Sequence, residues 1–581
     1  MSVARRHVLS LSLGAAVSAL CAPIVFGESA GKDILVASNQ PGRSGGNLTI
    51  ALRSEPKTLN PALASDASTL SVIYCMGADL IHINRLSQRT EPGLAKFWTS
   101  SRDGLNYTLQ LRRGVRFSDG RPFNADDVVF SFQAYLDENT HSPQRDLLIV
   151  GGRPIAVEKL DDYTVRFHLA QPYAAAERLF DGFPILPGHL LEASYRSGNF
   201  AQAWGISMQP GQFAGLGPFR LKEYVAGQRL VLERNPYYWK QDSVGNHLPY
   251  LDEITFLFVS SEDAQVIRFL SGDTDVLSRF SAGNFQALER QQAGKGFHVF
   301  DLGPGLEYNF LFFNLNDLPA EKSPDLVKKQ IWFRDILFRQ AVSASIDRAA
   351  IVRLIYNGRA APIATTATPG NKLWIDSAIP PAAHSPDQAR QLLKAAGFSW
   401  RSDGSLVDSH GNLVEFSILT SSSNEQRAKM ATLIQDDLSH VGMNVHIVLL
   451  DFEAMVGRLL DSFDYEAAIS GIADGDADPN SEMNIWLSSG GMHLWHLNEK
   501  KPATSWEADL DRLMEAQLVT LNATRRKRLY DRVQEIVAEQ LPLIPLVSPD
   551  VLAAAWDRVG NFQPAILDPN ALWNVDSLYV R

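Results

Sequence analysis

Hydrophobic residues follow two different patterns along the chain, and the pattern changes near residue 300. Before that point, short stretches alternate apolar and polar residues, which is typical of strands with one buried face. These expected strands are NLTIAL (47–52), YTLQL (107–111), VRF (115–117), YTVRFHL (163–169) and a hairpin at 219–235 that turns at Gly227. ITFLFV (254–259) is apolar throughout, which predicts a strand buried on both faces. One amphipathic helix is expected here, with Asn124 as its N-cap.

The second half alternates helices with strands. Strands are expected at 310–316, 413–419, 444–450, 465–470 and 543–547, and helices at 334–358, 387–397, 424–442, 505–519 and 524–540. The strand–helix–strand unit over 413–450 should be parallel. This order predicts an α/β fold with at least two lobes, in which ligands bind outside the carboxyl ends of strands.

An acidic loop leaves the carboxyl end of the expected strand at 465–470. It places Asp474, Asp476 and Asp478 at alternate positions. A calcium loop of the EF-hand type would need Gly at its sixth position and Glu at its twelfth, where this chain has Pro479 and Ile485. We interpret the loop as ligand-facing, with a solvated acidic loop as the alternative.

Composition and motifs exclude several classes of function. The net charge of −11 argues against nucleic-acid binding, which needs clustered basic residues. The letters GRSGG (42–46) fit G-x-S-x-G but lack the strand and helix that position a nucleophile, so no enzyme and no cofactor is predicted. His493 and His496 could take a metal with one carboxylate. The SSGG before them suggests an irregular segment, and no third ligand stands nearby, so no metal site is predicted.

The N-terminus predicts export. Arg5 and Arg6 precede an uncharged apolar run, and residues 1–27 therefore form an expected signal peptide, followed by a flexible Gly-rich leader over 28–46. The arginine pair resembles a twin-arginine signal without its usual flanking residues, and both export routes stay open. Cys21 lacks the Leu at −3 and the small residue at −1 of a lipoprotein signal, so no lipid anchor is expected.

Several segments, in this order, carry a family resemblance. They are EPKTLNP (55–61), GLNYTLQLRRGVRFSDGRPFNADDVVFSF (104–132), GPFRLKEY (217–224), RNPYYW (234–239), FRQAVSASIDRAAIV (338–352), PDQARQLLKAAGF (386–398) and RLYDRVQEIVAEQLPLIPL (528–546). Together they resemble the bacterial extracellular solute-binding proteins of family 5, the peptide/nickel-type receptors of ABC importers, over residues 47–548.

The resemblance implies a bilobed periplasmic-binding-protein fold of the class II type, with an extra inserted β-rich domain. Domain I would be discontinuous, domain II would be the insert, and domain III would form the other lobe. The expected ranges are 47–70, 205–305 and 541–581 for domain I, 71–204 for domain II, and 306–540 for domain III. Closure on ligand would be a hinge motion.

The resemblance also nominates ligand-binding residues. In peptide-binding members, an aspartate three residues before the acid of an acid–proline pair holds the ligand's α-ammonium. Here the pair is Asp478-Pro479 and Gly475 stands at that position, flanked by Asp474 and Asp476. Further candidates for the cleft wall are Tyr308, Asn309, Trp486, Trp495, Ser65 and Asp66, for which core packing or a turn is the alternative.

The function that the resemblance implies is capture without chemistry. A monomeric periplasmic receptor would close on a small polar solute, an oligopeptide first of all, and deliver it to the transmembrane subunits of an ABC permease. An oligosaccharide or a nickel chelate is the alternative ligand, and a secreted hydrolase is the alternative from another class. No nucleic acid is expected as a partner.

Overall fold

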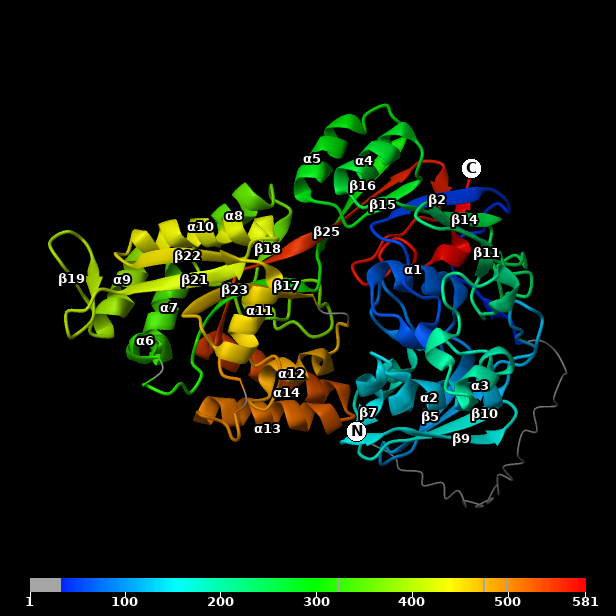
Figure 1. Cartoon of the computed structure of the whole chain (residues 1–581), viewed down its shortest axis with the longest axis horizontal. Coiled ribbons are helices and arrows are strands. Elements are labelled where there is room, and N and C mark those ends of the chain that lie inside the picture. The colour runs from blue at the N-terminus through cyan, green and yellow to red at the C-terminus, as the bar shows by residue number, and fades with distance from the viewer. Residues whose placement is uncertain (1–32, 322, 474–475, 498) are drawn as a thin grey trace, which may run out of the picture.

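Two lobes, each with its own central sheet, lie side by side and are joined by two crossing segments (Figure 1). The computed structural model describes residues 33–321, 323–473, 476–497 and 499–581. The expected signal peptide at 1–27 lies outside the described residues. In the described part of the chain, no helix combines the length and the apolar character that crossing a membrane requires.

The first lobe contains both the start and the end of the described chain. Its main sheet has the order β11 (Phe219–Val225), β12 (Arg229–Arg234), β14 (Glu253–Phe258), β2 (Asn47–Leu52), β15 (Val276–Ser278), β25 (Val547–Trp556) and β16 (Phe297–Pro304). The helices α4 (Glu262–Ser271) and α5 (Ala282–Gln291) pack beside β15, β16 and β25. β18 (Ala360–Pro362), which comes from the middle of the chain, pairs with β25.

A second, four-stranded sheet belongs to the same lobe. Its order is β5 (Ala95–Ser100), β6 (Asn106–Leu111), β10 (Thr164–His168) and β9 (Ala156–Asp161). The helix α2 (Ala125–Leu136) packs on it and begins at the expected N-cap Asn124. Asp127 completes a capping box, because its carboxylate accepts from the Asn124 N–H at 3.0 Å. α1 (Ala67–Met76) and α3 (Gly188–Arg196) complete this part.

The second lobe is built on a five-stranded sheet. Its order is β22 (Asn444–Leu450), β21 (Glu415–Ser421), β23 (Ala467–Ala473), β17 (Glu307–Phe313) and β24 (Leu543–Pro545). Helices surround this sheet: α6 (Pro324–Arg334), α7 (Ile336–Ser345), α8 (Arg348–Ile355), α9 (Pro386–Ala395), α10 (Glu425–Ser439), α11 (Phe452–Gly457), α12 (Met483–Trp486), α13 (Ser505–Val519) and α14 (Ala523–Gln540). β21 and β22 pair in parallel, as the sequence predicts.

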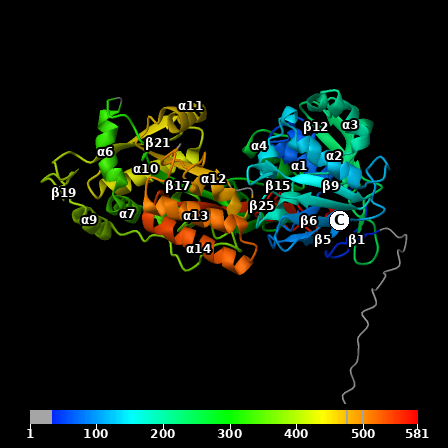
Figure 2. The ribbon, with the colours of Figure 1, turned by 90° about the horizontal axis from the view of Figure 1, so that it is seen from below.

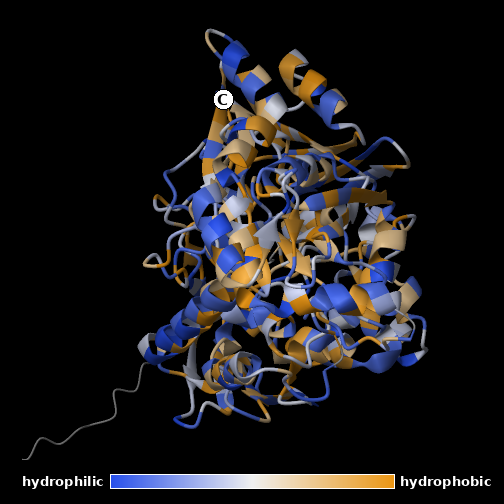
Figure 3. Ribbon diagram, turned by 90° about the vertical axis from the view of Figure 1, so that its left-hand side faces the viewer, coloured by the Kyte–Doolittle hydropathy of each residue, from blue (hydrophilic) through white to orange (hydrophobic). Residues whose placement is uncertain are grey.

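The hydropathy pattern accounts for these layers. The strands of the sheets are mostly apolar (Figure 3). The surrounding helices contain both apolar and polar residues, as amphipathic helices packed on a sheet do. The view from below shows α13 and α14 on the side of the second lobe that faces the first (Figure 2). There the Ala174 N–H donates to the Leu518 carbonyl at 2.7 Å and joins the lobes.

The structure corrects four expectations. Order begins before residue 47, because β1 (Leu35–Val36) pairs with β13 (Lys240–Gln241). VRF (115–117) is not a strand and makes only an isolated bridge at Arg116. β14 is buried on one face only, with Ile254 and Phe256 inward.

The fourth correction concerns the helix expected at 334–358. It is broken into α7 and α8, because Ile346 is extended and Asp347 caps a new helix.

Two short connections carry the chain between the lobes. One lies between β16 and β17, at Gly305 and Leu306, and the other is Leu546, between β24 and β25. They are held together, since the Gly305 N–H donates to the Pro549 carbonyl at 2.9 Å and the Ser548 hydroxyl donates to the Gly305 carbonyl at 3.2 Å. The two connections between the lobes therefore lie side by side.

Candidate functional site

A cavity of about 1510 Å³ lies between the lobes, and both lobes line it. The first lobe contributes the start of α1, the end of β2 and the segment 566–576. The second lobe contributes Glu307 and Asn309 of β17, the start of α10 and Ala473 at the end of β23. The start of α10 and the end of β23 stand at the carboxyl edge of the five-stranded sheet, where ligands bind in open α/β folds.

Asn309 is the predicted residue that reaches this cavity from the second lobe. It is buried, and its side-chain oxygen accepts from Arg427 Nε at 2.9 Å. Arg427 also lies 3.4 Å from the Glu307 carboxylate. Gly471 leaves room for this arginine, since a Cβ at that position would be 2.3 Å from Arg427 Nη2. The arrangement fixes an amide and a carboxylate at the base of the cavity.

The opposite wall holds an ionisable cluster that the sequence did not single out. Asp79, His82 and Arg85 line the cavity. Asp181 behind them accepts from both guanidinium nitrogens of Arg85, at 3.1 and 3.0 Å, and from the Ile83 N–H at 2.8 Å.

Asp79, unlike Asp181, has no lysine or arginine at ion-pair distance in the described part of the chain, although Arg85 and Lys240 lie near enough to oppose the rise of its pKa. Its Oδ1 atom is enclosed and has no hydrogen-bond partner among the described residues. Burial, and next the charge of Asp181, raise the pKa of Asp79 to about 8, whereas the pKa of Asp181 is lowered by Arg85 against its own burial. The raised pKa favours the protonated form of Asp79, and a cation bound beside it would favour release of the proton.

Charges of both signs surround the remainder of the cavity. Asp550 lines it, and burial together with the neighbouring Asp301 raises the pKa of Asp550 to about 7. Most of the basic residues in the wall already have an acidic partner, as Arg279 has in Asp568 and Lys240 has in Asp576. Aromatic side chains, among them Tyr356, also contribute to the wall.

The predicted residues near the first strand and on β17 divide between the cavity and the interior. Ser65 lines the cavity. Asp66 does not, because its carboxylate caps α1 and accepts from the Thr69 N–H at 2.9 Å. Tyr308 is wholly buried and packs on Phe310, with ring centroids 5.8 Å apart. Neighbouring strand residues face opposite sides, so Asn309 and Tyr308 could not both face the ligand.

The two predicted tryptophans belong to the core of the second lobe. Trp486 and Trp495 are buried, and their rings lie 5.9 Å apart. Trp486 Nε1 donates to Glu482 Oε2 at 2.7 Å, and Trp495 Nε1 donates to Glu507 Oε1 at 3.1 Å. Core packing, the alternative for these residues, therefore describes both of them.

The described aspartates of the acidic loop contact arginines rather than the cavity. Asp476 pairs with Arg178 of the first lobe, whose Nε lies 2.6 Å from Asp476 Oδ2. Asp478 is buried against Arg526, with contacts of 2.8 and 2.5 Å, and also caps the turn after it. Asp474 and Gly475 lie outside the described residues.

The sequence carries a weak signal for the cluster that was missed. Gly77, Ala78 and Gly93 surround Asp79 with small residues, and a Cβ at Gly93 would be 2.5 Å from the Asp79 carbonyl oxygen. Small residues directly before a carboxylate at the end of a helix indicate a closely packed turn. The partner Asp181 stands about a hundred positions later, and only the fold brings it to Asp79.

Comparison with known proteins gives a consistent result. The profile of the bacterial extracellular solute-binding proteins, family 5 (middle region), matches residues 89–493. A curated relative from Deinococcus radiodurans, called a probable ABC transporter-binding protein, is 29% identical over 97% of this chain and 96% of its own length. Di/tripeptide-binding protein 1 of Pseudomonas aeruginosa is 25% identical over 91% of this chain and 94% of its own.

A solved structure shares the fold. The ABC transporter substrate-binding protein CtaP from Listeria monocytogenes superimposes with a TM-score of 0.75 at 24% identity. The match covers 93% of this chain and 100% of the other.

Proposed function

Because the chain belongs to the bacterial extracellular solute-binding proteins of family 5, we propose that it captures an oligopeptide between its lobes and delivers it to an ABC permease. Proteins of this family bind solutes for ABC transporters and are not enzymes in general. The ligand would be bound one to one and released unchanged. The fold is the bilobed one of the family.

The observation that carries the proposal is the size and charge of the cavity. Small-molecule sites commonly measure about 300–1,000 Å³, and this cavity of about 1510 Å³ is larger. Charged residues line both walls, with Asp79 and Arg279 in the first lobe and Glu307 and Lys429 in the second. A zwitterionic peptide needs room for several residues, an acidic group for its ammonium and a donor for its carboxylate.

Asp79 is the group that we assign to the ligand's α-ammonium. Its carboxyl lines the cavity, its Oδ1 has no hydrogen-bond partner among the described residues, and a cation close to it would favour the ionised carboxylate. The aspartates 476 and 478 already pair with arginines, so they support this role less well. A charge-assisted hydrogen bond of this kind contributes about 1.5–3 kcal/mol, which corresponds to an affinity factor of about 10–100.

A directly coordinated metal ion fits the wall poorly. Asp79, His82 and Asp181 offer ligand atoms within 4.8 Å of one another. Asp181 is already occupied by Arg85, which contacts it at 3.0 Å, so the cluster leaves too few ligands for a metal ion. A nickel chelate or an oligosaccharide therefore serves as the comparison ligand in the test.

The test compares ligand classes on the wild type and on Asp79→Asn. Peptides of two to nine residues, their N-acetylated forms, oligosaccharides and nickel–histidine are screened by thermal shift, and affinities are then measured by calorimetry. Free peptides should raise Tm, and Asp79→Asn should weaken them about 10-fold or more while leaving acetylated peptides unchanged. The matched control is Asp66→Asn, which removes a similar charge from a helix cap outside the cavity wall.

Two results would contradict the proposal at different levels. If no peptide shifts Tm and a sugar or nickel–histidine does, the peptide assignment is wrong. If peptides bind but Asp79→Asn weakens free and acetylated forms equally, the anchor is wrong and the receptor function stands. Recovery of cleaved peptide would support the secreted hydrolase instead.

The setting and the domain division remain part of the proposal. We expect the mature chain to act in the periplasm as a monomer after export, with no nucleic-acid partner and no resident cofactor. We also propose the three expected domains, although the boundary expected at residue 70 falls within α1. Mass spectrometry of the secreted chain would locate the cleavage site.

A further inference from the structure

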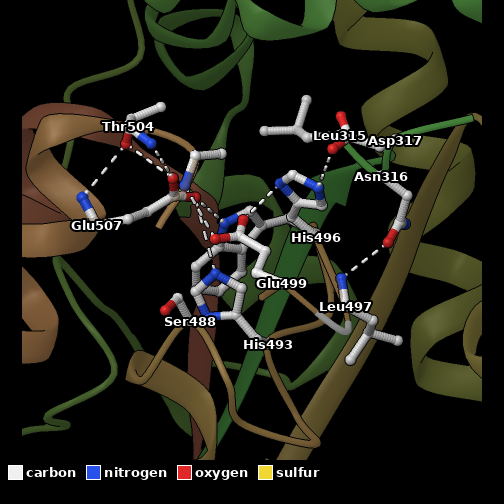
Figure 4. A network of polar contacts seen from close by, with 12 residues as sticks. Leu315, Asn316, Asp317, Ser488, His493, His496, Leu497, Glu499, Thr504 and Glu507 are labelled. Atoms are coloured by element: carbon white, nitrogen blue, oxygen red, sulfur yellow. Dashed lines mark hydrogen bonds and ion pairs between the residues drawn. The ribbon is translucent and has the colours of Figure 1, made fainter. Parts of the chain in front are cut away.

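A second group of ionisable side chains lies in the second lobe, apart from the cleft (Figure 4). It is formed by His493 and His496 of the segment between α12 and α13, by Glu499 after them and by Glu507 in the first turn of α13. None of the four lines the cavity between the lobes. The sequence analysis found no further ligand beside these histidines, although Glu499 stands three residues after His496; the structure brings Glu499 and Glu507 to them.

His493 has an unused nitrogen in a buried position. The residue is 0% exposed, and its Nδ1 lies 2.9 Å from the Ile485 carbonyl oxygen, so Nδ1 carries the proton that is donated there. This leaves a lone pair on Nε2, which has no hydrogen-bond partner among the described residues. Nε2 faces Glu507 Oε1 at 3.7 Å. Two acceptors that face each other in the interior require a cation between them.

The carboxylates are held in place by their other contacts. Glu507 Oε2 accepts from the Thr504 N–H and the Thr504 hydroxyl, both at 2.8 Å. Glu499 Oε2 accepts from the Ala503 N–H at 3.0 Å, and its Oε1 is enclosed and lies 2.5 Å from His496 Nδ1. Glu499 Oε1 and Glu507 Oε1 therefore point toward the histidines, and Glu507 Oε1 also accepts from Trp495 Nε1 at 3.1 Å.

His496 has the same arrangement with its nitrogens exchanged. Its Nε2 lies 3.5 Å from the exposed Asp317 carboxylate, and Nδ1 faces Glu499. A metal-ligating histidine commonly donates its other N–H to a carboxylate or a carbonyl, as His496 and His493 can. Within the described residues, neither Glu499 nor Glu507 has a lysine or arginine at ion-pair distance, although only 2% of each side chain is exposed.

We propose that His493 Nε2, His496 Nδ1, Glu499 Oε1 and Glu507 Oε1 bind one divalent transition-metal ion, Zn²⁺ in the first instance. The ligand atoms of His493, Glu499 and Glu507 lie within 4.8 Å of one another. Zinc bonds of about 2.0–2.1 Å place tetrahedral ligands about 3.4 Å apart. The 3.7 Å between His493 Nε2 and Glu507 Oε1 fits this spacing, whereas His496 Nδ1 and Glu499 Oε1, 2.5 Å apart, would have to separate by about 1 Å. Two imidazoles and two carboxylates suit zinc better than calcium or magnesium, which prefer oxygen ligands alone.

Four protein ligands and no open position describe a structural site. The ion would fix the segment between α12 and α13 to the start of α13 and to the chain that follows β17. Two hydrogen bonds already connect the segment between α12 and α13 to the chain that follows β17. The Leu315 N–H donates to the Trp495 carbonyl and the Leu497 N–H donates to Asn316 Oδ1, both at 2.8 Å. The role is independent of the ligand in the cleft.

The test uses the tag-free mature chain after dialysis against a chelator. We expect one zinc per chain by calorimetry and elemental analysis, and a Tm rise of about 2 °C or more with added zinc. Cobalt should give the visible absorption bands of a tetrahedral site. His493→Ala and Glu499→Gln should each weaken zinc binding at least about 10-fold. The matched control is His446→Ala, which removes an exposed histidine 2.5 Å from Glu415 and should change nothing.

Glu499→Gln keeps the size and the hydrogen bonds of its side chain, so it remains informative if His493→Ala does not fold. Absence of zinc uptake by the folded wild type would overturn the proposal, since a proton shared between His493 and Glu507 would then account for the geometry. Equal zinc affinity of the wild type and Glu499→Gln would overturn it too.

Discussion

The ion pair between Asp476 and Arg178 connects the lobes directly, and its removal should weaken ligand binding without touching the cavity. Asp476 follows β23 in the second lobe, whereas Arg178 lies in the short helical turn at 176–180 of the first. Arg178 contacts Asp476 through two nitrogens and also donates to the Gln88 carbonyl at 3.0 Å. Asp476→Asn is the cleaner change, because it keeps the shape and leaves the bond to Gln88.

The size of the effect follows from the burial of the pair. The side chains of Arg178 and Asp476 are 13% and 33% exposed, so the pair is neither fully screened nor fully desolvated. Two unit charges 4 Å apart attract by about 4 kcal/mol at an effective dielectric constant of 20. Desolvation and partial screening reduce the net contribution to about 1–2 kcal/mol. If the unliganded protein is mostly open, closure becomes less favourable by that amount, and Kd rises about 5- to 30-fold.

The measurement is the Kd of the ligand found in the screen, for Asp476→Asn, Arg178→Ala and the double variant. The double-mutant cycle should give a coupling energy of about 1–2 kcal/mol, and the dissociation rate should account for most of the change. Arg196→Ala is the control, since it breaks an exposed pair with Glu192 inside one helix. Single variants with Kd within about twofold of the wild type would refute the reasoning.

Three further outcomes follow from other contacts. The pKa of Asp79 is about 8 in the folded protein, above its usual range. The contribution of its protonated form to folding stability is therefore complete below about pH 4 and is lost as the pH rises through 8. Asp79→Asn should therefore gain stability over the wild type by up to about 1.4 kcal/mol per pH unit across that window, and parallel pH–stability curves would contradict this. Arg526→Ala should destabilise by about 3–5 kcal/mol in denaturant unfolding, because it leaves Asp478 buried without its cation. A cost under about 1 kcal/mol would show that water replaces the arginine. Gly370→Ala should lower the free energy of unfolding by about 1–3 kcal/mol, because its Cβ would be 2.4 Å from the Pro304 carbonyl oxygen. The same clash should favour the open form of the protein, which small-angle scattering would detect. An unchanged scattering profile would contradict the second part.

Local features of the fold could be predicted where neighbouring residues determine them. Asn124 caps α2 because its oxygen reaches an N–H two residues later, and the hairpin at Gly227 depends on residues within one turn. The strand VRF failed for the opposite reason. Its apolar and polar residues alternate as in a strand, and Phe117 is buried. Arg116, however, forms only an isolated β-bridge, so no neighbouring strand pairs with this segment.

The ligand site was harder to predict because its contacts are distant in the sequence. The alternating aspartates indicated a ligand loop, but Arg178 and Arg526 reach them from positions far from the loop. A carboxylate near a strand's carboxyl end has the same pattern whether it meets a ligand or an arginine. Burial separates these cases, as it does for Trp486, and burial depends on the complete fold.

The place of β25 in the first lobe's sheet has a consequence for biogenesis. This strand lies between β15 and β16 although it begins only at Val547, after the whole second lobe. A chain that emerges from its N-terminus can therefore complete the second lobe's sheet first, because β17 to β24 are all made before β25. The first lobe must keep a gap open inside its sheet until almost the last residues arrive. Truncation before Val547 should therefore disrupt the first lobe's sheet while sparing that of the second lobe.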